Sequence, residues 1–142
     1  LTGIAQMFIL IGATTLLFQL KWGDSLGVIV LVLAAVFGAT GWGMFITAFA
    51  RTPAQVGSLG SAIMLIFGIL GGSFISLDNM PPLVQTLSRI TPNSWALDGF
   101  TTLALGGTLS NLSTPLTALL TMGSLLFAAS VFLFGRKNLV QK

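Results

Sequence analysis

The side chains that most often carry chemistry are scarce in this sequence. It contains no histidine and no cysteine, and its acidic residues are Asp24, Asp78 and Asp98. The commonest general base and metal ligand is therefore absent, and so is a thiolate nucleophile. No G-x-x-x-x-G-K-[ST] motif occurs, so the chain has no P-loop of its own to hold the phosphates of ATP. We expect no catalytic residue, no metal site and no cofactor bound by this chain.

The remaining polar residues leave two kinds of chemistry to consider. Ser58 and Ser73 lie beside glycines, but a serine nucleophile needs a base, and histidine is absent. Asp78 and Asp98 could pair as a carboxylate dyad, although both fall in a polar segment. A proton-coupled carrier usually holds an ionisable residue inside its membrane bundle, and the long apolar runs carry none. These observations favour a passage driven from elsewhere, which suits an apolar or amphipathic substrate.

The composition indicates a membrane protein. Of the 142 residues, 54% are hydrophobic and 6% are charged, whereas a soluble domain has about a quarter charged. The net charge of +3 is too small to indicate nucleic-acid binding. About 20 apolar residues suffice to cross the bilayer as a helix. The sequence predicts an all-α membrane protein, a bundle of four transmembrane helices with a two-helix re-entrant or interfacial hairpin before the last span. The predicted spans are 2–20, 26–50, 55–77 and 115–134, with the hairpin at 78–113.

The hairpin is too polar to span a bilayer and too apolar for an ordinary solvated loop. Asp78 or Asn79 can cap a helix whose first turn tolerates Pro81 and Pro82. The Thr91-Pro92 step ends that helix. A second short helix follows over 95–105, with Asn93 as its predicted cap and Gly106-Gly107 at its end.

Small residues recur at helical spacing in two of the spans. The second span has Gly27, Ala34, Gly38 and Gly41 on one face, and the third has Gly57, Gly60, Ser61, Met64, Gly68 and Gly71. Such faces let helix backbones approach closely in lipid. The face of the third span either lines a central interface or substrate path, or serves close packing alone, since glycine is common in membrane helices.

The basic residues predict an orientation. Four spans place Arg51, Arg136, Lys137 and Lys142 on one side and leave Lys21 and Arg89 on the other. The positive-inside rule then puts the C-terminus in the cytoplasm and the hairpin outside. The chain starts at Leu1 inside an apolar run without a signal-peptide layout. We expect it to be the C-terminal part of a longer multi-pass protein of the plasma (inner) membrane.

Arg89 and Asp98 are the opposite charges of the hairpin, and they allow two interpretations. They could latch an external gate. Alternatively, they are solvated interface charges worth under about 1 kcal/mol.

An ordered series of motifs surrounds the hairpin. It comprises Gly71-Gly72-Ser73-Phe74, Met80-Pro81-Pro82, Ile90-Thr91-Pro92, Trp95-Ala96, and Asp98-Gly99-Phe100 leading to Leu105-Gly106-Gly107. This order resembles the membrane subunit of ABC exporters of the ABC-2 type, and the resemblance covers most of the chain. One departure is Ile75-Ser76, since members often have a proline just after the aromatic residue.

The resemblance implies six spans per subunit, cytoplasmic ends and two re-entrant helices before the last span. It implies an ATP-binding subunit, separate or fused, which carries ATP and Mg, and a second permease subunit in a homo- or heterodimer. The substrate path would then include Ser58, Ser61, Met64, Phe67 and Gly68. The external hairpin and gate would include Phe74, Pro81, Pro82, Arg89, Pro92, Trp95 and Asp98. The alternatives are a non-transporting membrane anchor or assembly module, and a fragment of an energy-independent carrier.

Overall fold

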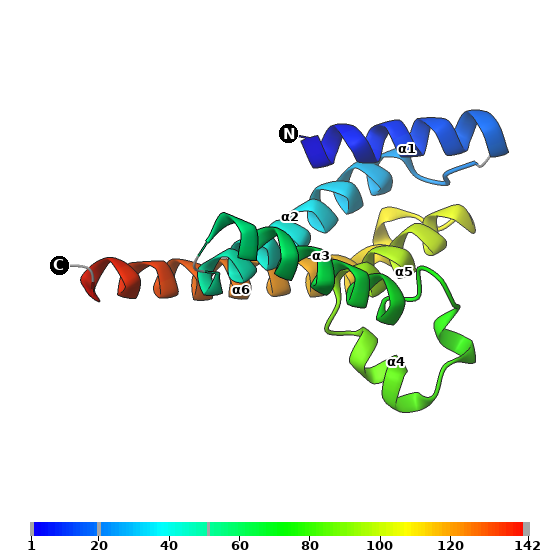
Figure 1. Cartoon of the computed structure of the whole chain (residues 1–142). Coiled ribbons are helices and arrows are strands. Elements are labelled where there is room, and N and C mark those ends of the chain that lie inside the picture. The colour runs from blue at the N-terminus through cyan, green and yellow to red at the C-terminus, as the bar shows by residue number, and fades with distance from the viewer. Residues whose placement is uncertain (1, 20, 51, 141–142) are drawn as a thin grey trace.

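The computed structural model describes residues 2–19, 21–50 and 52–140, and every regular element in these ranges is helical. Figure 1 shows α2, α3, α5 and α6 in an elongated arrangement, with α1 above it, α4 projecting below it and the C-terminal part of α6 extending beyond it. The elements are α1 (Thr2–Phe18), α2 (Ser25–Phe49), α3 (Pro53–Leu70), the 3₁₀ turn η1 (Leu77–Asn79), α4 (Pro82–Ser88), α5 (Pro92–Ala104), η2 (Leu109–Leu112) and α6 (Ser113–Val140).

The helices α2 and α6 form the central pair of the fold. A Cβ added at Gly41 would lie 2.9 Å from the carbonyl oxygen of Gly123, so the two backbones touch at this point. A Cβ at Gly123 would in turn lie 2.5 Å from the ring of Phe37. The predicted small face of the second span is confirmed, because its members are all buried in α2. Without a hydrophobic force between helices in lipid, such close backbone contact is what holds a pair together.

The helix α5 runs antiparallel along the first half of α2. Near its end, Leu103 is fully buried against Gly27, and the Gly23 amide donates to the Leu103 carbonyl at 3.1 Å. One turn earlier, Gly99 leaves room for Leu31, whose side chain lies 2.7 Å from the position of a Cβ. The start of α5 at Pro92 therefore lies beside the middle of α2.

Three of the described helical segments are long and apolar enough to cross a membrane. They are Ser25–Phe49, Pro53–Leu70 and Leu109–Gly135, while the apolar segment Thr2–Leu17 of α1 is shorter. The helix α3 ends at Leu70 rather than at residue 77, because Gly72 adopts a left-handed backbone with φ of +83° that stops the helix. The predicted end of the first span at residue 20, and the basic residues Arg51 and Lys142, lie outside the described residues.

Two predicted caps are wrong. Asp78 and Asn79 belong to η1, and α4 starts after Pro81 without a side-chain cap. The helix α5 is capped by Thr91 instead of Asn93, and the Thr91 hydroxyl accepts from the Ser94 amide at 3.3 Å. Proline favours the first helical position, so Pro92 starts the helix and the cap lies two residues before the predicted one.

Candidate functional site

The predicted path residues on α3 fall into two groups. Ser58, Ser61 and Met64 are exposed, whereas Phe67 and Gly68 are buried. Among the described residues, a Cβ at Gly57 or Gly60 would have no neighbour within 4 Å. Against the described residues, the first half of α3 therefore presents an open small-residue face, and its buried residues lie in its last turns.

The end of α3 is held by the hairpin and by α2. A Cβ at Gly68 would lie 3.1 Å from the ring of Phe74, whose side chain is otherwise 71% exposed. Phe67 packs edge-on against Trp42 of α2, with ring centroids 4.8 Å apart. The structure thus brings Gly68 together with Phe74 and Phe67 together with Trp42. No close contact between Ser58 or Ser61 and the hairpin is present among the described residues.

Arg89 makes three contacts that join the end of α4 to α5. Its guanidinium pairs with the Asp98 carboxylate and lies 4.6 Å from the centroid of the Trp95 ring. The Trp95 indole N–H donates to the Arg89 carbonyl at 2.8 Å. The side chains of the ion pair are 45% and 46% exposed, so solvent weakens the charge interaction. The contacts of Arg89 with the Trp95 indole therefore contribute much of the attraction between the end of α4 and α5.

The three prolines of the hairpin start its helices. Pro82 occupies the first turn of α4, as the sequence predicts, with Pro81 just before it. Pro92 occupies the first turn of α5, which therefore starts before the predicted residue 95. Pro92 is buried, whereas Pro81 and Pro82 are exposed.

The turn between α4 and α5 contains hydroxyl groups that the sequence analysis missed. Ser88, Thr91 and Ser94 are at most 1% exposed, and each donates to a backbone carbonyl three residues earlier. Buried hydroxyls must be hydrogen-bonded. A signal was available in the sequence: hydroxyl residues spaced by three around an X-Pro step are typical of a capped turn.

Asp24 was missed as a link between distant parts of the chain. One carboxylate oxygen accepts from the Leu26 amide at 3.1 Å and so caps α2. The other accepts from the Leu109 amide at 3.0 Å, across 85 residues of sequence. The capping position is readable from sequence, but the contact to η2 is not. Asp24 therefore ties the α1–α2 turn to the segment before α6.

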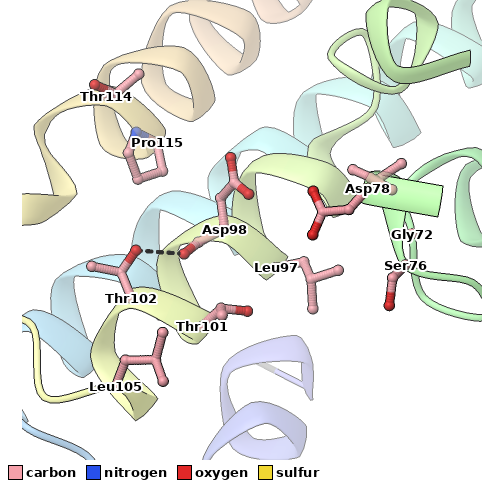
Figure 2. Close-up of a pocket in the computed structure, with 11 residues that line it drawn as sticks. Gly72, Ser76, Asp78, Leu97, Asp98, Thr101, Thr102, Leu105, Thr114 and Pro115 are labelled. Atoms are coloured by element: carbon pink, nitrogen blue, oxygen red, sulfur yellow. Dashed lines mark hydrogen bonds between the residues drawn. The ribbon is translucent and has the colours of Figure 1, made fainter. Parts of the chain in front are cut away.

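A pocket of about 500 Å³ lies between α5, the η1 region and the start of α6. Figure 2 shows Asp78, Asp98 and Thr101 around it, with the Thr102 hydroxyl donating to the Asp98 backbone carbonyl. The two carboxylates share this pocket, but the Asp98 carboxylate is already paired with Arg89. The described residues hold no group of three or more acidic, histidine or cysteine side chains that could bind a metal. The pocket offers polar contacts and no nucleophile with a base.

Comparison with known proteins places the chain in a family. The family model for the ABC-2 type transporter matches residues 1–105. The linearmycin resistance permease protein LnrN of Bacillus subtilis (strain 168) is 31% identical over 105 residues, which are 74% of this chain and 27% of that protein. The chain thus spans about a quarter of the length of this curated relative. No solved structure matches. The family match includes the motifs from Gly71 to Leu105 that carry the predicted resemblance, and it confirms that resemblance. The chain belongs to the ABC-2 type transporter family.

Proposed function

We propose that the protein is the permease subunit of an ATP-driven ABC-2 type exporter that forms its translocation path as a dimer with ATP-binding subunits. The observation that carries this proposal is the family match over residues 1–105. The absence of a P-loop from this sequence fits ATP binding, with Mg, on a partner. The protein is then a multi-pass protein of the plasma (inner) membrane with a cytoplasmic C-terminus.

In this proposal α1, α2, α3 and α6 span the membrane, and α4 and α5 form the re-entrant hairpin on the outer side. The path of α5 along α2 supports this arrangement. Leu103 meets α2 near its start, at Gly27, and Pro92 shares a cavity lining with Ala35 and Thr40. At 1.5 Å per residue, the start of α5 therefore lies about 15 to 22 Å along α2 from Ser25. From there α5 runs back toward the start of α2.

The open face of α3 is the proposed path and dimer surface. Ser58, Ser61 and Met64 are exposed on a helix in whose first half a Cβ at Gly57 or Gly60 would have no described neighbour within 4 Å. A second copy or a substrate could approach this face without displacing any described residue. The hairpin residues Arg89, Trp95 and Asp98 then form part of the outer gate.

The proposed substrate is an amphipathic antimicrobial compound. The similar protein from Bacillus subtilis is named for resistance to linearmycin. In the spans, the described residues carry no acidic side chain that would serve proton coupling. Export powered by a partner ATPase and directed at a lipid-like compound agrees with both observations.

The direct test is drug sensitivity combined with partner loss. Deletion of the gene should lower the inhibitory concentration of linearmycin or of another amphipathic antibiotic in a panel. Inactivating the P-loop lysine of the co-purifying ATP-binding subunit should have the same effect. Unchanged sensitivity to the whole panel, with no ATP-binding subunit co-purifying, would contradict the proposal.

Dimer formation is tested separately, and the sequence helps because it has no cysteine. Ser61→Cys should give a crosslink between subunits, whereas Ser124→Cys on the exposed surface of α6 serves as the control. A membrane anchor whose small faces pack only within one subunit would give no crosslink at Ser61.

A further inference from the structure

A second cavity, of about 630 Å³, lies between α1, α2, α3 and α5, away from the pocket of Figure 2. Gln6 and Leu10 line it from α1, Ala35 and Thr40 from α2, Met64 from α3, and Asn93 from α5. Its volume falls within the range of small-molecule sites, roughly 300 to 1,000 Å³. Four separate elements border a space that their own side chains do not fill.

The cavity lies at the level of the middle of α2. Ala35 and Thr40 are ten and fifteen residues from the start of this helix at Ser25. The helix is long and apolar enough to cross a membrane, so these residues fall about 15 to 22 Å from its start. A ligand in the cavity is then surrounded by the hydrocarbon part of the bilayer.

Two amide side chains of the cavity have no internal partner. Gln6 and Asn93 make no hydrogen bond with any described residue, whereas the Thr40 hydroxyl donates to the Val36 carbonyl at 2.7 Å. An unpaired amide in an apolar medium costs several kcal/mol, about 4 to 8 for transfer to hydrocarbon. Polar side chains at membrane depth commonly mark a functional site. Both amides are accessible rather than buried, since no buried side-chain nitrogen or oxygen of the described residues lacks a partner. They are therefore available to pair with polar groups of a molecule in the cavity.

The rest of the lining defines the chemistry of the occupant. The lining contains no charged side chain, and its surface is predominantly apolar. An amide both donates and accepts, so it pairs equally with a hydroxyl or a carbonyl group. Gln6, Leu10 and Met64 are exposed at the rim, which leaves the cavity open between α1 and α3.

We propose that this cavity binds an uncharged amphiphile whose hydroxyl or carbonyl groups reach the amides of Gln6 and Asn93. Since Met64 also belongs to the open face of α3, the cavity adjoins the proposed path and would admit the compound from the surrounding lipid. The role as an entry site rests on the proposed export function, whereas binding itself does not.

The test uses the full-length protein in liposomes and a photoreactive diazirine analogue of monoolein, an uncharged amphiphile with two hydroxyl groups. After irradiation, mass spectrometry should find the label on peptides of α1, α2 and α5. Unlabelled monoolein should displace it, and stearate or stearylamine at the same concentration should not. Equal displacement by all three compounds would overturn the assignment.

A matched pair of variants localises the binding. Ala39→Trp fills the cavity from α2 and should lower labelling about tenfold, a loss of about 1.4 kcal/mol. Ala128→Trp, at an exposed position of α6, should leave it unchanged. Size-exclusion profiles check that both variants fold. Equal labelling of the two variants contradicts the proposal.

The double variant Gln6→Leu with Asn93→Leu tests the amides without filling the cavity. It should weaken labelling by the monoolein analogue and leave labelling by a diazirine alkane of equal length unchanged. Equal effects on both probes would overturn the role of the amides. ATP-dependent export is measured in parallel, so that labelling without export refutes the proposed function alone, and export without labelling refutes the cavity alone.

Discussion

The α2–α6 pair and the helix α3 are built from similar residues and packed in opposite ways. Both regions are rich in glycine at helical spacing. In α2 the glycines Gly27, Gly38 and Gly41 are buried against other parts of the chain. In α3, Gly57 and Gly60 have no neighbour among the described residues. The same sequence pattern therefore marks an internal contact in one helix and an unpartnered face in the other.

The difference indicates which parts are fixed and which are available. The α2–α6 contact is backbone on backbone and tolerates no added atoms. The α3 face can accept atoms from a second subunit or a substrate. We therefore expect substitutions of the buried glycines of α2 to lower stability, and substitutions of Gly57 or Gly60 in α3 to lower function without loss of stability.

The largest effect is expected at the backbone contact of α2 and α6. Gly41→Leu places a side chain where a Cβ already lies 2.9 Å from the Gly123 carbonyl oxygen. Overpacking costs about 1 to 3 kcal/mol, and occasionally more. The free energy of unfolding, measured by SDS titration in mixed micelles, should fall by that amount.

The matched control is Gly43→Leu in the same helix, since a Cβ at Gly43 has no described neighbour within 4 Å. This variant should unfold like the wild type. If Gly41→Leu and Gly43→Leu had the same stability, the close contact of α2 with α6 would be wrong.

A smaller loss is expected at Asp24, which ties the start of α2 to η2. Asp24→Ala removes the cap of α2 and the acceptor for the Leu109 amide. Losing a cap and leaving a partly buried amide unpaired costs about 1 to 2 kcal/mol. Asp24→Asn keeps one acceptor oxygen, and asparagine caps helices well. The unfolding free energy of this variant should therefore be closer to that of the wild type than to that of Asp24→Ala.

The sequence predicts where the helices lie along the chain better than it predicts which helices pack against each other. Periodicity and proline positions predict the segments around α2, α3 and the hairpin, because these signals are local. The turn at Gly71-Gly72 ends α3 before the predicted position, since a left-handed glycine outweighs the apolar run that continues to Leu77. The Asp24 contact to Leu109 spans 85 residues, and no local pattern reports it.

The candidate site shows the same division. The motifs around Pro81, Pro92 and Trp95 identify the hairpin, but the caps predicted for its two helices are wrong, because proline decides where each helix starts. The small face of α3 is also readable. Whether other helices cover that face cannot be read from the sequence, because burial depends on which helices lie beside it. The face of α2 with the same spacing is covered.

A modest effect is expected at the ion pair of the hairpin. A double-mutant cycle with Arg89→Ala and Asp98→Ala should give a coupling energy under about 1 kcal/mol, because both side chains are nearly half exposed. High salt should reduce it further. Replacing Trp95 by leucine, with Arg89 and Asp98 unchanged, tests how much the contact of Arg89 with the indole ring contributes to stability. A coupling above about 2 kcal/mol would favour a gate latch over a solvated pair.

The smallest change in stability is expected on the open face of α3, where the comparison is sharpest. Gly57→Leu adds a side chain to a position with no described neighbour within 4 Å. Leucine favours the helix over glycine by up to about 1 kcal/mol, so the unfolding free energy should stay constant or rise slightly. If this face receives a second subunit or a substrate, the same variant should lower the Ser61→Cys crosslink and the resistance to amphipathic antibiotics. Resistance and crosslinking both at the wild-type level would show that this half of α3 faces lipid alone, and that its glycines serve neither a partner nor a path.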